Sequence, residues 1–171
     1  MNTIDTLRKR LKGNRLVVQN EDGFVSEVAF EWNEPTTEEE IRIFEKQHSI
    51  MLPRSYREFL KISNGAVLFK DIEYGQWGCR ILGLSELHST TLDMKTWGCE
   101  LPSSFLVFAT WLGDLDVLLF DLKRLETNEK SYIIDGEQGV KVEEWSVING
   151  DFSKWLDRLV IAQGTKYWRW Y

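Results

Sequence analysis

Three aspartates carry the side chains best suited to catalysis or metal binding, and they surround one apolar stretch: Asp114, Asp116 and Asp121. A metal site or a glycosidase needs carboxylates that converge on one concave spot. Side chains alternate along a strand, so Asp116 and Asp121 are predicted to point to opposite faces. The spacing therefore does not force convergence, and a solvated turn followed by a capping aspartate is the preferred interpretation. An enzyme with a carboxylate site ranks last among the functions considered.

The two histidines and two cysteines offer little further chemistry. His48 continues an apolar helical face, which is typical of a half-buried packing residue. His88 and Ser89 are adjacent in sequence and do not indicate a catalytic triad, because triads combine residues from separated segments. Cys79 and Cys99 have no CxxC partner or nearby histidine, so we expect free thiols and no zinc. The sequence contains no P-loop, GxGxxG, GxSxG or HExxH motif. We therefore expect no metal, no cofactor and no enzymatic activity.

Composition indicates a single ordinary domain in the cytoplasm. The 171 residues are 43% hydrophobic, which suffices for a packed core, and no apolar run is long enough to cross a bilayer. Residues 1–14 lack the apolar core of a signal peptide, so a cytoplasmic location without a membrane partner is expected. The 21 basic and 27 acidic residues give a net charge of −6, which disfavours nucleic acid as a partner. That charge suits a basic protein partner, although it also serves solubility.

Helices and strands must position these side chains. Residues 52–65 predict one helix, because they contain signals for both its start and its end. Pro53 suits the first helical position, and Asn64-Gly65 tolerates the left-handed conformation that closes a helix. Four residues between them share one face at helical spacing: Tyr56, Phe59, Leu60 and Ser63. A capping box of Thr37 and Glu40 predicts a preceding helix to about residue 47.

The remaining pattern predicts helices at residues 3–12 and after Asp151, and strands around an apolar centre. Residues 105–111 are apolar on both faces, which is typical of a central strand covered on both sides. Residues 90–102 are predicted to be a loop or short helix, and the aromatic tail 167–171 is predicted to fold back. The other predicted strands are 15–19, 24–32, 66–69, 80–84, 115–120, 132–134 and 140–145.

Several of these motifs resemble those of the SMI1/KNR4 superfamily, also called the SUKH superfamily. Residues 52–65 contain its Leu-Pro, Tyr, Phe-Leu and Asn-Gly pattern, and Gly83 lies in an Ile/Leu-Gly strand before an acidic, leucine-containing segment. The Gly113-Asp114 turn between strands, with Asp121 after the second, and the closing helix are also similar. The resemblance spans about residues 36–160. It implies an α+β fold with a mainly antiparallel sheet packed against a helical pair and a C-terminal helix. We expect one such domain over residues 1–171, with a helix-hairpin extension at about 1–34.

The resemblance also implies a function in binding. Bacterial members of the superfamily act largely as immunity proteins that bind and neutralise a cognate toxin domain, often a nuclease, and fungal members act as interaction scaffolds in cell-wall signalling. The expected partner is therefore a basic toxin domain, met by a monomer or a homodimer. A regulatory scaffold without a toxin partner is the alternative.

Loops that combine aromatic and acidic side chains are the candidate partner-binding sites, because loops on a rigid scaffold concentrate binding residues. Aromatic groups can be desolvated at an interface and carboxylates steer a basic partner. Trp111, at the third loop, is itself expected in the core. The candidates are Asp71, Glu73, Tyr74 and Trp77 in the first loop, Asp93, Trp97 and Glu100 in the second, and Asp114 and Asp116 in the third.

Overall fold

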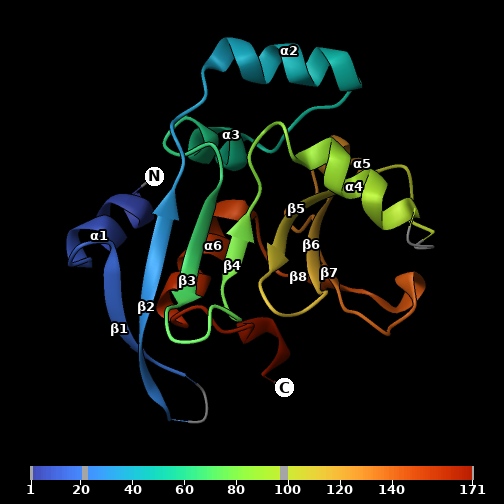
Figure 1. Ribbon diagram of the computed structural model, residues 1–171. Coiled ribbons are helices and arrows are strands. Elements are labelled where there is room, and N and C mark those ends of the chain that lie inside the picture. The colour runs from blue at the N-terminus through green and yellow to red at the C-terminus, as the bar shows by residue number, and fades with distance from the viewer. Residues whose placement is uncertain (1, 21–22, 97–99, 171) are drawn as a thin grey trace.

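The computed structural model describes residues 2–20, 23–96 and 100–170, and it confirms an α+β fold with an antiparallel sheet (Figure 1). No helix within these ranges combines the length and the apolar character needed to cross a bilayer. The described helices and strands are α1 Asn2–Arg10, β1 Arg15–Gln19, β2 Val25–Trp32, α2 Glu38–His48, α3 Arg54–Leu60, β3 Ala66–Asp71, β4 Cys79–Ile81, α4 Leu87–Thr96, β5 Phe105–Trp111, β6 Val117–Asp121, α5 Leu122–Glu126, β7 Ile133–Gly136, β8 Ser146–Ile148 and α6 Phe152–Ile161, with 3₁₀ helices η1 Val142–Glu144 and η2 Tyr167–Arg169.

In the described residues the sheet is an eight-stranded meander in which every strand pairs antiparallel with its sequence neighbours. The β1–β2 hairpin joins this sheet, because β2 pairs with β3 through Val28 opposite Asp71 and Trp32 opposite Ala66. Because consecutive strands run in opposite directions, alternate loops lie at the same end of the sheet. The loops after β1, β3, β5 and β7 all leave the sheet at the same end.

Helices cover the two faces of the sheet unequally (Figure 1). α3 and α6 pack on one face of β5 and β6, where Tyr56 lies 5.1 Å from Phe120 and Phe108 lies 5.3 Å from Trp155, between ring centroids. α4 lies on the other face, and its Thr91 hydroxyl accepts the backbone N–H of Val107 at 3.0 Å. β5 is therefore covered on both sides, as its apolar sequence predicts.

The predicted helix caps are present at α2 and α6. Thr37 and Glu40 form the reciprocal capping box at the start of α2, and the Asp151 carboxylate accepts the N–H of Lys154 at 2.8 Å at the start of α6. The position of the helix stop in α3 is wrong, because the helix ends at Leu60. Asn64-Gly65 instead turns the chain into β3.

Two other segments differ from the sequence-based expectation. Residues 140–145 were expected as a strand but contain η1, because the Trp145 indole N–H donates to the carbonyls of Glu137 and Val140, both at 3.1 Å, and curls the segment. The short helix α5 has no counterpart in the prediction, although Asp121 caps it by accepting the N–H of Lys123 at 3.1 Å. The tail does fold back, since Trp168 packs edge-on against the buried Trp111 at 5.7 Å.

Candidate partner-binding surface

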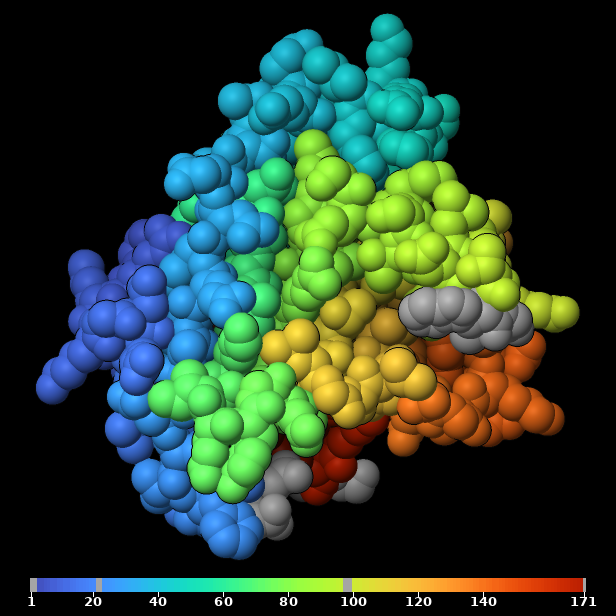
Figure 2. Space-filling view, viewed as in Figure 1, coloured from blue at the N-terminus to red at the C-terminus, as the bar shows by residue number. Residues whose placement is uncertain are grey.

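The lower end of the sheet in Figure 1 collects two of the three predicted binding loops. The β3–β4 loop and the β5–β6 turn leave the sheet there, beside the C-terminal tail that follows α6. On the face shown in Figure 2 the two loops lie side by side. They touch so closely that a Cβ on Gly113, whose φ is +82°, would lie 1.8 Å from the carbonyl oxygen of Gln76. The loops therefore form one continuous surface.

Within the β3–β4 loop, the two predicted acids have different surroundings. The Asp71 carboxylate accepts the backbone N–H groups of Glu73, Tyr74 and Gly75 at 3.2, 2.8 and 3.1 Å, so it shapes the turn. Glu73 is exposed, and its hydrogen bond to the Tyr74 hydroxyl raises the pKa of that phenol. The Tyr74 side chain is 73% exposed and Trp77 38% exposed. Glu73, Tyr74 and Trp77 are thus the residues of this loop that a partner can reach.

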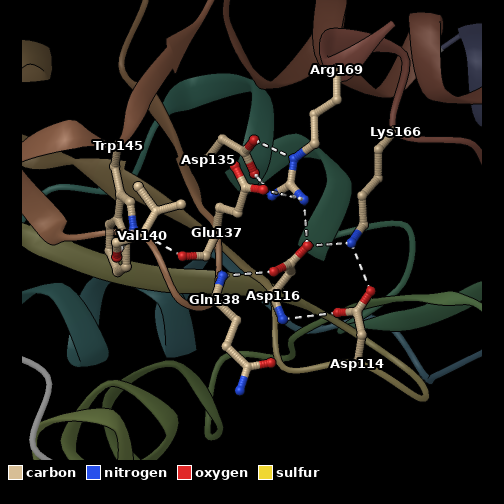
Figure 3. A network of polar contacts seen from close by, with 9 residues as sticks. All are labelled: Asp114, Asp116, Asp135, Glu137, Gln138, Val140, Trp145, Lys166 and Arg169. Carbon is tan, nitrogen blue, oxygen red and sulfur yellow. Dashed lines mark hydrogen bonds and ion pairs between the residues drawn. The ribbon is translucent and has the colours of Figure 1, made fainter.

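The carboxylates of the third loop belong to an ion-pair network with the C-terminal tail (Figure 3). The Lys166 ammonium binds both Asp114, at 2.7 Å, and Asp116. Arg169 binds Asp116 at 2.6 Å and reaches Asp135 on β7 through two bonds of 2.6 Å each. Asp135 is only 4% exposed. The network fixes the tail against the ends of β6 and β7.

The same contacts set the protonation of the network. Burial by itself raises the pKa of Asp116, but the N–H of Gln138 and the cations of Lys166 and Arg169 outweigh it and hold that pKa below its ordinary value. Burial opposes the charge of Arg169 too, yet Asp135 and Asp116 raise its pKa. Asp114 and Asp116 are thus engaged by cations of the tail, so they act first on the tail.

Convergence of Asp114, Asp116 and Asp121, which a carboxylate enzyme requires, does not occur. Asp121 lies at the far end of β6 and caps α5, whereas Asp114 and Asp116 precede β6 and bind Lys166. Nowhere in the described ranges do three or more histidine, cysteine or acidic side chains form a group that could hold a metal ion. The buried thiol of Cys79 is also unsuited to nucleophilic chemistry, because burial raises its pKa.

The second predicted loop lies beside α4, at a different part of the surface. Asp93 is exposed on α4, and Glu100 lines a cavity of about 480 Å³ between α4 and residues 136–145. Trp97 lies outside the described residues. The structure thus separates this loop from the β3–β4 loop, and it places residues 136–145 beside Glu100.

A second cavity, of about 460 Å³, lies between the β1–β2 hairpin, β3 and the tail. Asp71 and Trp77 from the predicted site line it together with Lys166, Arg169 and Trp170. The Lys166 ammonium lies 5.6 Å from the Trp77 ring centroid and 5.0 Å from that of Trp111. Lys166 and Arg169 are engaged by carboxylates and Asp71 by backbone N–H groups, so the cavity offers aromatic surface more than free charge.

Sequence reasoning missed the residues that hold or complete this surface: Asp135, Lys166 and Arg169 in the network, and Glu137, Glu143 and Trp145 beside Glu100. The ion pairs of the tail join positions 34 to 53 residues apart, which no local pattern encodes. The sequence does show acidic residues beside Trp145, at Glu143 and Glu144. The alternating Val140 and Val142, however, favour a strand and not a binding segment.

Comparison with known proteins gives a family for this arrangement. The sequence model of the SMI1 / KNR4 family (SUKH-1) matches residues 35–158. The chain is similar to YobM of Bacillus subtilis (strain 168), described as an uncharacterized protein, with 26% identity over 136 residues that cover 77% of this chain and 69% of YobM. It is also similar to YnaB of the same organism, likewise described as uncharacterized, with 23% identity over 144 residues that cover 84% of this chain and 90% of YnaB. The β1–β2 hairpin and the tail lie outside the family match.

Proposed function

The chain belongs to the SMI1/KNR4 family, and on that basis we propose that it is a non-catalytic immunity protein that binds and neutralises a cognate toxin domain of a bacterial polymorphic toxin system. The family match carries this proposal. It covers the whole helical pair and the sheet from β3 to β8. The toxin domain is proposed to be of the nuclease type.

The proposed mechanism is occlusion of the toxin by an acidic surface. A nuclease binds phosphates through clustered lysine and arginine, so the face that it uses for its substrate is basic. A chain with a net charge of −6 attracts such a face and is steered onto it. Neutralisation then needs only that the nucleic acid be excluded.

The loops supply groups suited to such an interface. Glu73, Asp93 and Glu100 are exposed carboxylates, and Tyr74 and Trp77 are exposed or half-exposed aromatic side chains. Aromatic residues contribute most of the energy of many interfaces, while peripheral charges set the rate of encounter. Asp71, Asp114 and Asp116 are proposed to contribute indirectly, because they hold the loops in shape.

Growth rescue by co-expression tests this function. The toxin domain encoded beside the gene for this chain is expressed in a host in three ways: alone, together with this chain, or together with a different member of the family. We expect growth to recover only with this chain, and an active-site variant of the toxin domain to co-purify with it. Continued toxicity with no co-purification would contradict the proposal. Capture of other cellular proteins without rescue would favour the regulatory scaffold instead.

A further inference from the structure

The cavity beside Glu100 is a groove with an apolar floor. It lies between Met94 of α4, Glu100 and the segment 136–145, and we call this space the α4 groove. Met94 on α4 and Val117 on β6 are buried at its base, while Leu115 is 62% exposed. Val142 and Trp145 line it from the opposite wall. An apolar floor with an exposed leucine favours insertion of an apolar side chain.

The 136–145 wall of this groove is held in place before any partner arrives. The Trp145 indole N–H donates to two carbonyls, those of Glu137 and Val140, at 3.1 Å each. The backbone N–H of Gln138 donates to the Asp116 carboxylate at 2.8 Å, which ties the segment to the network of Figure 3. A wall fixed in this way loses little conformational entropy on binding, so it is prepared for a partner.

The rim of the α4 groove carries unbalanced negative charge. Glu100, Glu137 and Glu143 line it, against the single base Lys141. Some acids elsewhere are held in ion pairs, as where Glu38 and Glu45 both bind Arg57. Within the described residues no ion pair involves Glu100 or Glu143, and Glu137 reaches Arg169 only at 3.8 Å. Carboxylates around an apolar floor are complementary to a cationic segment that carries an apolar side chain.

From this complementarity we propose that the α4 groove is the docking site for a basic segment of the partner protein, with lysine or arginine at the rim and one apolar side chain on the floor. The inference rests on the proposed function, because the partner is the toxin domain proposed above. It goes beyond that function in assigning most of the specificity to α4 and residues 136–145. The cavity beneath the hairpin is a poorer candidate, since its two cations are already paired with carboxylates and its Asp71 is engaged by backbone N–H groups.

Charge reversal with a matched control tests the assignment. The groove pair, Glu100→Lys with Glu143→Lys, changes the net charge by +4, from −6 to −2. The control pair, Glu39→Lys with Glu126→Lys, makes the same change at exposed sites of α2 and α5. Binding of an inactive variant of the neighbouring toxin domain is measured at low ionic strength by surface plasmon resonance. We expect the groove pair to lower the association rate constant at least about tenfold, and the control pair less than about threefold.

Leu115→Arg tests the apolar floor without removing a buried group, since this leucine is already largely exposed. It is expected to raise the dissociation rate constant at least about tenfold, with an unchanged near-ultraviolet circular dichroism spectrum. Equal effects of the two charge pairs, or no effect of Leu115→Arg, would overturn the groove and leave the proposed function intact. Failure of the wild-type chain to bind the domain at all would overturn both.

Discussion

At the scale of single residues, Asp135 and Arg169 join β7 to the C-terminal tail through a buried, two-bonded ion pair. Neither partner's role is visible from its neighbours in sequence. Removing the Asp135 charge leaves Arg169 with Asp116 as its remaining close carboxylate, whereas removing Arg169 leaves the nearly buried Asp135 without its cation. Either loss is more costly than the loss of an exposed pair. This asymmetry makes the pair a sensitive probe of how the tail is held.

Asp135→Asn is predicted to lower the free energy of unfolding by about 3 kcal/mol, because Arg169 loses its most buried partner. Urea denaturation followed by tryptophan fluorescence measures the change. Glu137→Gln is the control, since Glu137 is exposed and 3.8 Å from Arg169, and it should change stability by less than about 0.5 kcal/mol. Equal effects of the two substitutions would show that burial of Asp135 is not what matters.

His48, at the end of α2, packs against His88 of α4, and its protonation makes the free energy of unfolding depend on pH. Its ring lies 4.5 Å from Phe44 and 4.3 Å from His88, between centroids. Burial, and then the neighbouring His88, lower its pKa below the ordinary 6.5, so the folded state favours the neutral ring. The unfolded chain therefore takes up the proton more readily as the pH falls.

The stabilisation from neutral His48 should be complete above pH 6.5 and decline as the pH falls through 6.5 toward the lowered folded value. His48→Phe keeps an aromatic ring against Phe44 but removes the proton. The loss of stability between about pH 7.5 and about pH 5.5 should be smaller in the variant than in the wild type. Parallel stability curves across that window would exclude this origin.

At the scale of elements, the segment 52–65 meets residues 82–84, which directly follow β4, through a contact between backbones. Gly65 has φ +91°, and a Cβ there would lie 2.8 Å from the backbone nitrogen of Gly83. The Asn64 side chain accepts the N–H of Leu84 at 2.7 Å, and the Tyr56 hydroxyl donates to the Leu82 carbonyl at 2.6 Å. The two glycine-containing motifs in the sequence are thus the two sides of one junction.

Gly65→Ala is predicted to destabilise the fold by at least about 2 kcal/mol, through strain at positive φ together with a clash against Gly83. Gly139→Ala separates the two causes, because Gly139 has φ +82° with nothing within 4 Å of its added Cβ. The control should cost about 1 kcal/mol. Thermal unfolding of both variants gives the comparison, and equal shifts in Tm would leave strain alone as the cause.

The sequence predicts elements well where a local signal is sufficient. The capping box of Thr37, the buried face of α3 and the apolar β5 depend on spacing within a few residues, and all are found. The alternating valines of residues 140–145 predict a strand, and this prediction is wrong. The Trp145 hydrogen bonds that bend the segment leave no signal in the local sequence pattern. The tail network joins distant positions, so only the folded chain reveals it.

At the scale of the whole molecule, the meander places four loops at one end of the sheet, and the tail lies there beside the β3–β4 loop and the β5–β6 turn (Figure 1). Glu100 and Glu143, which form no ion pair within the described residues, lie at the α4 groove, and exposed aromatic groups lie on the β3–β4 loop. Specificity in such a protein is set by surface side chains carried on a common fold.

The most direct test of binding without chemistry is a titration of the toxin's activity. Increasing amounts of the purified chain are added to the purified toxin domain, and nucleic-acid cleavage is measured alongside the intact mass of the toxin. The account predicts that activity falls to zero at one equivalent, that the mass is unchanged, and that activity returns when high salt separates the two proteins. Lasting inactivation by a small fraction of an equivalent, or an altered toxin mass, would contradict it.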